Sequence, residues 1–129
     1  MKEIGTLQWS LIVPDSWEFE TDSDCTSIWH AESIGALQVS CVVKDGTVTD
    51  SDLFEFANEN LQRGRDPVKV NLGDFTGILL EFVVEETAWR FWYLRSEDIG
   101  LFVTYNCEAV CSGLENERMD SVLATLKRF

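Results

Sequence analysis

The chain has 129 residues and a formal net charge of −13, from 10 Lys and Arg against 23 Asp and Glu. Apolar residues make up 45% of the sequence and aromatic residues 12%, which is enough to bury a core and excludes intrinsic disorder. Nucleic-acid binding is disfavoured, because the basic residues form only short pairs such as Arg63/Arg65 and Lys127/Arg128. We expect a single domain over residues 1–129.

The chain shows no sign of export or membrane insertion. Its first residues, 1–6, lack the apolar run behind a basic start that marks a secretory signal. Glu81 interrupts the longest apolar run, Gly77 to Val84, which is far shorter than the roughly 18 residues that span a bilayer. We therefore predict a cytoplasmic protein with reduced thiols and no membrane span.

The four cysteines do not have the spacing of a structural zinc site. Only Cys107 and Cys111 are close together, whereas such sites carry two tight pairs. Cys25 lies far from the other cysteines in the sequence. Cys41 belongs to an alternating apolar row, and a cysteine in such a row packs as a small hydrophobic residue. We expect ordinary thiols, no metal and no cofactor, with a zinc site or a disulfide as the alternatives.

Alternating apolar residues predict short strands in the first third of the chain, over residues 7–13, 17–20, 27–31 and 36–43. The period then changes to that of an amphipathic helix over residues 50–63, whose apolar stripe is Leu53, Phe56, Ala57 and Leu61. Thr49 and the acidic residues after it favour the helix N-terminus, and Gly64 and Pro67 end the helix.

Four further strands are predicted over residues 68–72, 75–85, 87–95 and 99–107, and their short connections favour an antiparallel meander. Ser112 and Glu115 match a capping box for a final helix, whose apolar stripe is Met119, Val122, Leu123, Leu126 and Phe129. The order predicts an α+β fold, a twisted antiparallel β-sheet packed with two amphipathic helices.

Several segments, in this order, resemble the PsbP-like superfamily, which includes the small bacterial DcrB-like proteins. The segments are Trp9-Ser-Leu-Ile-Val-Pro-Asp-Ser-Trp17, Gly35-Ala-Leu-Gln-Val-Ser40, Thr49-Asp-Ser-Asp-Leu53, Gly73-Asp-Phe-Thr-Gly77 and Phe102-Val-Thr-Tyr-Asn-Cys107. The resemblance covers nearly the whole chain by order of elements. It implies an α/β sandwich that serves as a binding or adaptor module, and it implies no catalytic set.

An acidic segment is the first candidate site. In an extended chain Glu18, Glu20, Asp22 and Asp24 project on one side at intervals of about 6.6 Å. An EF-hand loop starting at Asp22 fails, because Ser27 stands where that motif needs Gly. Three interpretations stay open: a solvated edge that discourages aggregation, a surface for a basic partner, or a calcium site.

The second candidate lies in the strand predicted over residues 87–95. Trp89, Phe91 and Tyr93 point to one face of that strand, and Arg90 and Trp92 to the other. The segment fits a central strand in the core. The functional alternative exposes Trp92 beside Arg90 as an interface anchor, because Trp and Arg are typical hot-spot residues.

Catalysis is not indicated. His30 is the only histidine, and the interpretation we favour for it is a structural or surface side chain. The phosphate-binding, nucleophile-elbow and zinc-protease motifs are absent from the sequence.

We therefore predict a non-enzymatic acidic module that binds a basic or amphipathic protein, such as an immunity protein or an adaptor or chaperone for a bacterial partner. Two alternatives are a small-ligand or metal-binding module with a pocket between sheet and helix, and a structural homodimer.

Overall fold

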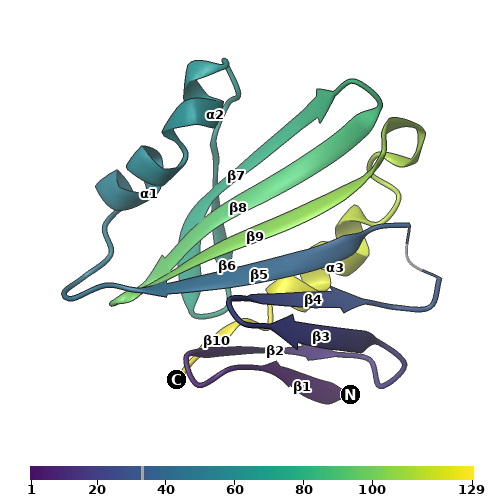
Figure 1. The fold of residues 1–129 in the computed structure, drawn as a ribbon, viewed down its shortest axis with the longest axis horizontal. Helices are drawn as coiled ribbons and strands as arrows, with labels where there is room; N and C mark the ends of the chain where they lie inside the picture. Colours follow the sequence, from purple (N-terminus) through teal and green to yellow (C-terminus); the bar gives the residue numbers. More distant parts are fainter. Residues whose placement is uncertain (33) are drawn as a thin grey trace.

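A twisted antiparallel sheet forms the body of the molecule (Figure 1). The computed structural model describes residues 1–32 and 34–129, and in these residues the sheet has seven strands in the order β3-β4-β5-β9-β8-β7-β6. The strands are β3 (Glu18–Asp22), β4 (Cys25–Trp29), β5 (Ala36–Val43), β6 (Val68–Leu72), β7 (Phe75–Val84), β8 (Thr87–Ser96) and β9 (Ile99–Glu108). Every neighbouring pair is antiparallel, as the short connections predict.

One face of this sheet carries the main hydrophobic core. A small second sheet and a helix cover it: β1 (Lys2–Gly5), β2 (Trp9–Val13), β10 (Lys127–Arg128) and α3 (Asn116–Leu123). Trp9 and Leu11 of β2 and Met119 of α3 are almost completely buried in the same cluster as Trp92 of β8. Figure 1 shows α3 behind β9 and β5.

The other face is only partly covered. The predicted helix over residues 50–63 is two short helices, α1 (Asp50–Phe56) and α2 (Asn58–Gln62). Thr49 caps α1 in a reciprocal capping box with Asp52, and Gly64 follows α2 with a φ of 81°, as the sequence predicts. A single turn residue, Ala57, separates α1 from α2; its backbone stays in the right-handed helical region, with φ −85° and ψ 0°, and its side chain is fully buried. The bonds from the Ala57 amide to Leu53 and from the Leu61 amide to Ala57 continue the helical pattern, so the two helices follow the predicted segment closely.

The predicted start of the last helix is wrong. A 3₁₀ turn, η1 (Ala109–Cys111), comes first, and α3 begins at Asn116 without a side-chain cap. Ser112 and Glu115 do not form the capping box, because the Glu115 side chain is buried and bonded to other elements. Leu126 and Phe129 lie outside the helix, since the chain turns after Leu123 to form β10 beside β2.

The fold is thus α+β and mostly antiparallel sheet. The predicted sandwich of one sheet and two helices is incomplete, because a second sheet contributes one layer of the core.

Candidate functional site

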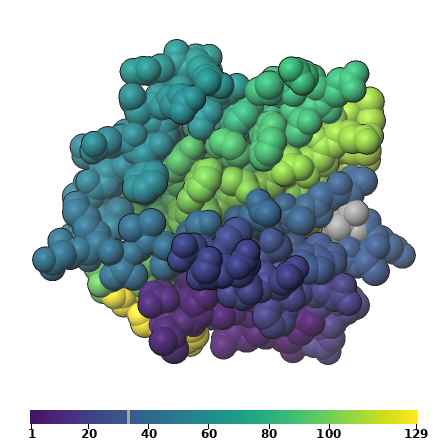
Figure 2. Space-filling model, viewed as in Figure 1, coloured from purple at the N-terminus to yellow at the C-terminus, as the bar shows by residue number. Residues whose placement is uncertain are grey.

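The face of the large sheet that carries α1 is only partly covered by the rest of the described chain. Residues paired directly across an antiparallel sheet point to the same face. The pairing therefore traces one face of the sheet from β3 through β4, β5 and β9 to β8, and this is the face that carries α1. We define the open face as Glu18, Glu20, Asp22, Ser27, Trp29, Gln38, Ser40, Phe82, Trp89, Phe91, Phe102, Thr104, Asn106 and Glu108. In Figure 2, strands β8 and β9 are uncovered between α1–α2 and β4.

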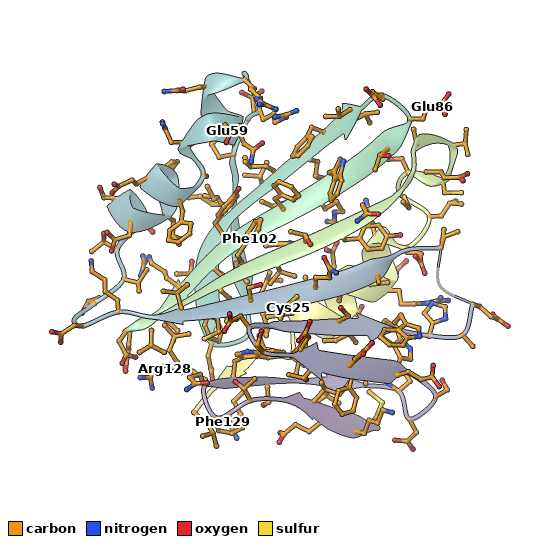
Figure 3. The ribbon with its side chains drawn as sticks, in the orientation of Figure 1. Cys25, Glu59, Glu86, Phe102, Arg128 and Phe129 are labelled. Atoms are coloured by element: carbon orange, nitrogen blue, oxygen red, sulfur yellow. The ribbon has the colours of Figure 1, made fainter. Side chains whose placement is uncertain are left out.

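A groove of about 600 Å³ lies where α1 stands over this face. Its walls are mainly apolar and come from β5, the residues before α1, α1 itself, β8 and β9. Phe102 forms part of its floor, and Figure 3 labels that side chain in the middle of the sheet. Val43 and Phe56 on the rim are 54% and 66% exposed and, together with Val42, leave an apolar margin around the groove. The groove therefore offers apolar area that the isolated chain does not bury.

A continuous row of aromatic rings extends from the groove along the open face. Tyr93 stacks on Phe102 with ring centroids 4.9 Å apart, and Phe102 meets Phe91 at 5.4 Å. Phe91 in turn contacts Phe82 at 5.0 Å and Trp89 at 5.5 Å, both edge to face. Sequence reasoning placed the rings of one strand on one face, but the contacts between strands depend on the sheet register.

The acidic segment forms the outer margin of the same face. Glu18, Glu20 and Asp22 are exposed on β3, the edge strand of the sheet, and pair with the open-face residues of β4. Asp24 does not continue the row, because the chain turns after Asp22 to pair that residue with Cys25. The structure thus brings three of the four predicted carboxylates to the outer margin of the open face, where polar residues such as Ser27, Gln38 and Ser40 lie between them and the aromatic row.

Two further carboxylates stand near the rim of the groove and are already paired. Asp52 accepts a 2.7 Å bond from Lys44, and Asp50 accepts a 2.7 Å bond from Arg95. These bonds hold the pKa of both carboxyl groups below the usual range. A general acid needs the opposite, a raised pKa, so these groups are suited to charge rather than to proton transfer.

Arg90 and Trp92 do not belong to this surface. Both point into the main core; Trp92 is 1% exposed and Arg90 7% exposed. The Arg90 guanidinium stacks 4.6 Å from the Trp92 ring and bonds Asp120 of α3 at 2.9 Å. The prediction of Trp92 as an exposed interface anchor is wrong, because a central strand covered by α3 buries that face.

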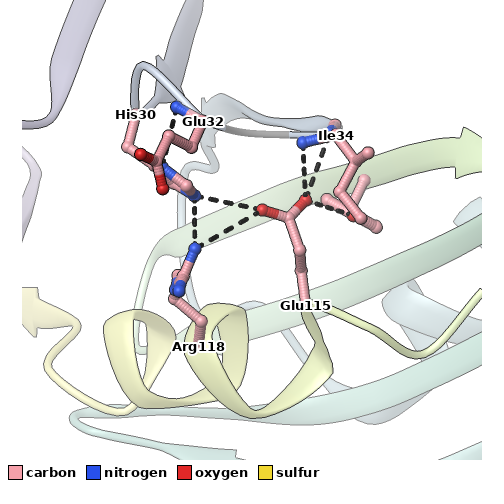
Figure 4. Close-up of polar contacts among 7 residues, drawn as sticks. His30, Glu32, Ile34, Glu115 and Arg118 are labelled. Carbon is pink, nitrogen blue, oxygen red and sulfur yellow. Dashed lines mark hydrogen bonds and ion pairs between the residues drawn. The ribbon is translucent and has the colours of Figure 1, made fainter. Parts of the chain in front are cut away.

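A buried polar cluster joins α3 to the β4–β5 connection (Figure 4). The Glu115 carboxyl group, 5% exposed, accepts bonds from Tyr105 Oη at 2.6 Å and from the backbone amides of Ile34 and Gly35. Its other oxygen lies 3.1 Å from His30 Nε2, and Arg118 Nη1 lies 2.7 Å from the same nitrogen. Sequence reasoning named Glu115 only as a capping residue, and its contacts in this cluster depend on elements distant in the chain.

This cluster is suited to holding the fold together. Its members come from the β4–β5 connection, β9 and the start of α3, and burial together with the Glu115 bond raises the pKa of the Tyr105 hydroxyl. A tyrosine held neutral in this way donates its proton only as a hydrogen bond. His30 also packs against Trp17, with ring centroids 5.1 Å apart.

The thiols form neither a disulfide nor a metal site in the described residues. Cys25, Cys41, Cys107 and Cys111 are free thiols, and burial raises the pKa of Cys41. Across residues 1–32 and 34–129, no group of three or more His, Cys, Asp or Glu is placed to hold a metal ion. None of the helices in this part of the chain is long and apolar enough to cross a membrane.

Comparisons with known proteins reveal the fold alone. No family model and no curated protein matches the sequence. A protein of known structure from Bacteroides thetaiotaomicron superposes with a TM-score of 0.72 at 14% identity, over 94% of this chain and 45% of its own. The chain therefore spans less than half of that relative. LpqN of Mycobacterium tuberculosis, described as involved in cell envelope biogenesis, gives a TM-score of 0.58 at 14% identity, over 93% of this chain and 82% of LpqN.

These structures are similar to this chain in fold, and their identities are too low to carry a function across. The fold and the open face define a mostly antiparallel α+β structure with an apolar groove beside α1. Membership of the PsbP-like superfamily stays a prediction.

Proposed function

We propose that this protein is a non-enzymatic binding module whose open face receives a basic, amphipathic segment of a partner protein. The observation that carries the proposal is the joining of an apolar groove and a row of carboxylates on one face of one sheet. An immunity protein and an adaptor or chaperone both fall within this class. A PsbP-like sandwich, which we also propose, is consistent with it.

The groove provides the apolar part of the recognition. Val42, Val43 and Phe56 are at least half exposed around it, and covering them with a partner gains about 25 cal/mol for each Å² of apolar surface. Exposed apolar area of this kind, bordered by polar residues, is typical of interaction sites.

The carboxylates determine the sign of the partner's charge. Glu18, Glu20 and Asp22 are exposed along one margin of the open face, and the chain as a whole carries −13. A basic segment relieves their mutual repulsion, and long-range attraction accelerates its association. The same field repels acidic segments and nucleic acid.

Synthetic peptides provide the test. A Leu/Lys peptide of about four helical turns, with its Leu residues on one side, is titrated by calorimetry against the protein, with a Leu/Glu peptide of the same pattern as its counterpart. We expect saturable binding of the basic peptide that weakens several-fold as salt rises from about 20 to about 300 mM, and no binding of the acidic one.

Variants locate the surface. Phe56→Ser weakens the apolar contact, and joint replacement of Glu18, Glu20 and Asp22 by their amides removes the charge. A matched control replaces three exposed carboxylates elsewhere, Glu3, Glu32 and Glu117, in the same way. Equal loss in both triple variants would show that net charge alone attracts the peptide, and the proposed surface would be wrong.

A second function is favoured by the size of the groove. Its volume of about 600 Å³ lies within the range of about 300–1,000 Å³ usual for small-molecule sites. An apolar small molecule would then bind between α1 and the sheet. Native mass spectrometry of the protein from its host distinguishes the two, since a retained small molecule adds a fixed mass.

A further inference from the structure

The aromatic row on the open face already binds one guanidinium, which belongs to the protein itself. Arg65, just after α2, holds its guanidinium carbon 3.8 Å from the centroid of the Phe82 ring. A 2.9 Å bond from its Nη1 to Asn60 Oδ1 fixes that position. Arginine stacks in this way because its planar cation is attracted to the negative face of an aromatic ring.

Trp89 is the next ring in the row and has no such cation. It pairs directly with Phe82 across β7 and β8, and it is partly exposed. Within residues 1–32 and 34–129, no Lys or Arg of the chain stacks on Trp89. Indole is the best cation platform among the aromatic side chains.

Carboxylates border this end of the row. Trp89 pairs with Asn106 of β9, and Glu108 follows two residues later on the same face, which makes Glu108 a diagonal neighbour of Trp89. Glu85 and Glu86 form the turn between β7 and β8, and the Glu86 carbonyl accepts a 2.7 Å bond from the amide of Ala109. That bond holds the turn against the end of β9, beside the exposed Glu108. Figure 3 labels Glu86 at the free end of the hairpin.

We propose that Trp89 is the platform for an arginine of the bound segment and that Glu108 pairs with the guanidinium. The inference rests on the proposed function and specifies the partner's chemistry: the segment carries arginine at this point, and lysine in its place lowers the affinity. A lysine ammonium has no plane to stack and holds its water more strongly, so it gains less from the same site.

The first experiment tests the site without any partner. The five indole resonances of the isotope-labelled protein are recorded by NMR during titration with N-acetyl-arginine amide or N-acetyl-lysine amide, and Trp89→Phe assigns the Trp89 signal. We expect the arginine compound to shift the Trp89 indole most and the lysine compound to shift it much less. Equal shifts with both compounds, or a shift confined to other indoles, would overturn the assignment of Trp89.

The second experiment uses the amphipathic peptide in a Leu/Arg and a Leu/Lys version. We expect the Arg version to bind about threefold to tenfold more tightly. Trp89→Leu removes that preference and Glu108→Gln reduces it. Trp29→Leu is the comparison, because Trp29 is a second partly exposed tryptophan on the open face and pairs with a carboxylate residue, Glu18. Loss of the arginine preference in Trp29→Leu but not in Trp89→Leu would place the platform at Trp29 and overturn the assignment of Trp89.

The outcomes separate the two proposals. Equal affinity for both peptides, or an arginine preference that survives Trp89→Leu, rejects the arginine platform and leaves the proposed function standing. A shifted Trp89 indole without binding of either peptide supports the platform and rejects the groove as a protein-binding site.

Discussion

Tyr105 donates a 2.6 Å hydrogen bond to Glu115, a carboxyl group that is 5% exposed and belongs to the start of α3. The bond spans the space between the large sheet and the helix that covers it. Because two backbone amides of the β4–β5 connection bind the same carboxyl group, Glu115 joins three parts of the chain.

Tyr105→Phe therefore leaves Glu115 with one bond fewer. Losing one partner of a buried polar group costs about 1–3 kcal/mol, which urea unfolding measures as a lower midpoint at an unchanged slope. Tyr93→Phe is the comparison, because Tyr93 Oη accepts a bond from the neutral Asn60 at 3.0 Å. An equal or smaller loss for Tyr105→Phe would show that the Glu115 bond contributes no more than a neutral one.

The same contact predicts a loss of stability in alkali. Burial and the Glu115 bond raise the pKa of Tyr105 above its ordinary value of 10.0, so the folded protein keeps a proton that the unfolded chain releases. This contribution is complete below pH 10 and falls as pH rises further, by up to about 1.4 kcal/mol per pH unit. Urea midpoints measured from pH 8 to 11 should fall more steeply for the native sequence than for Tyr105→Phe. Parallel curves would contradict the assignment.

Replacing the buried Arg90 should lower the stability of the fold. Its guanidinium is enclosed by Trp92, Glu81 and Asp120, with Nη2 2.9 Å from the Asp120 carboxyl group. Arg90→Ala removes the packing of the guanidinium and its stem on the Trp92 ring, while the carboxylates left behind are about half exposed, so we expect a loss of about 2 kcal/mol in urea unfolding, mainly from the cavity. Arg90→Met fills the space, and its loss should be smaller. If both variants lose the same amount, packing on Trp92 contributes nothing.

Alanine substitution at two glycines with positive φ should have very different effects on stability. A Cβ at Gly73, where φ is 62°, would collide with the backbone carbonyl of Leu126, whereas a Cβ at Gly46, where φ is 107°, meets open space. Gly73→Ala must move the segment that leads into β10, whereas Gly46→Ala adds only backbone strain. We expect Gly46→Ala to lower the free energy of unfolding by roughly 1 kcal/mol and Gly73→Ala to lower it several times as much. Thermal unfolding measures both, and equal melting temperatures would contradict the predicted contact between Gly73 and Leu126.

The cap of α1 predicts a local effect at the groove. Thr49 and Asp52 bond each other's backbone amides at 3.1 and 2.9 Å. Thr49→Ala should lower stability by about 1 kcal/mol and accelerate amide exchange in α1 more than in β8. Uniform acceleration across both elements would show that α1 does not open independently of the sheet.

Much of the secondary structure was accessible from the sequence because its causes are local. β5 and β6 have the predicted bounds, and the cap and the glycine stop around residues 49–64 follow from side-chain chemistry a few residues away. β1 and β10 were missed, since a strand of two to four residues exists only through its pairing with β2. The late start of α3 was missed as well, because the Glu115 side chain is buried and bonded to distant elements instead of capping a helix.

The amino-acid sequence by itself determined the acidic charge, the α+β class and which residues of each strand share a face, since these depend on composition and on a period of two or 3.6 residues. Only the tertiary structure decided which face is covered. It buried Trp92 under α3, left Trp89 and Phe102 on the open face, and placed Glu18, Glu20 and Asp22 at the margin of that face. The physical reason is that strand register and the docking of helices depend on contacts between residues far apart in the chain, which no local pattern records.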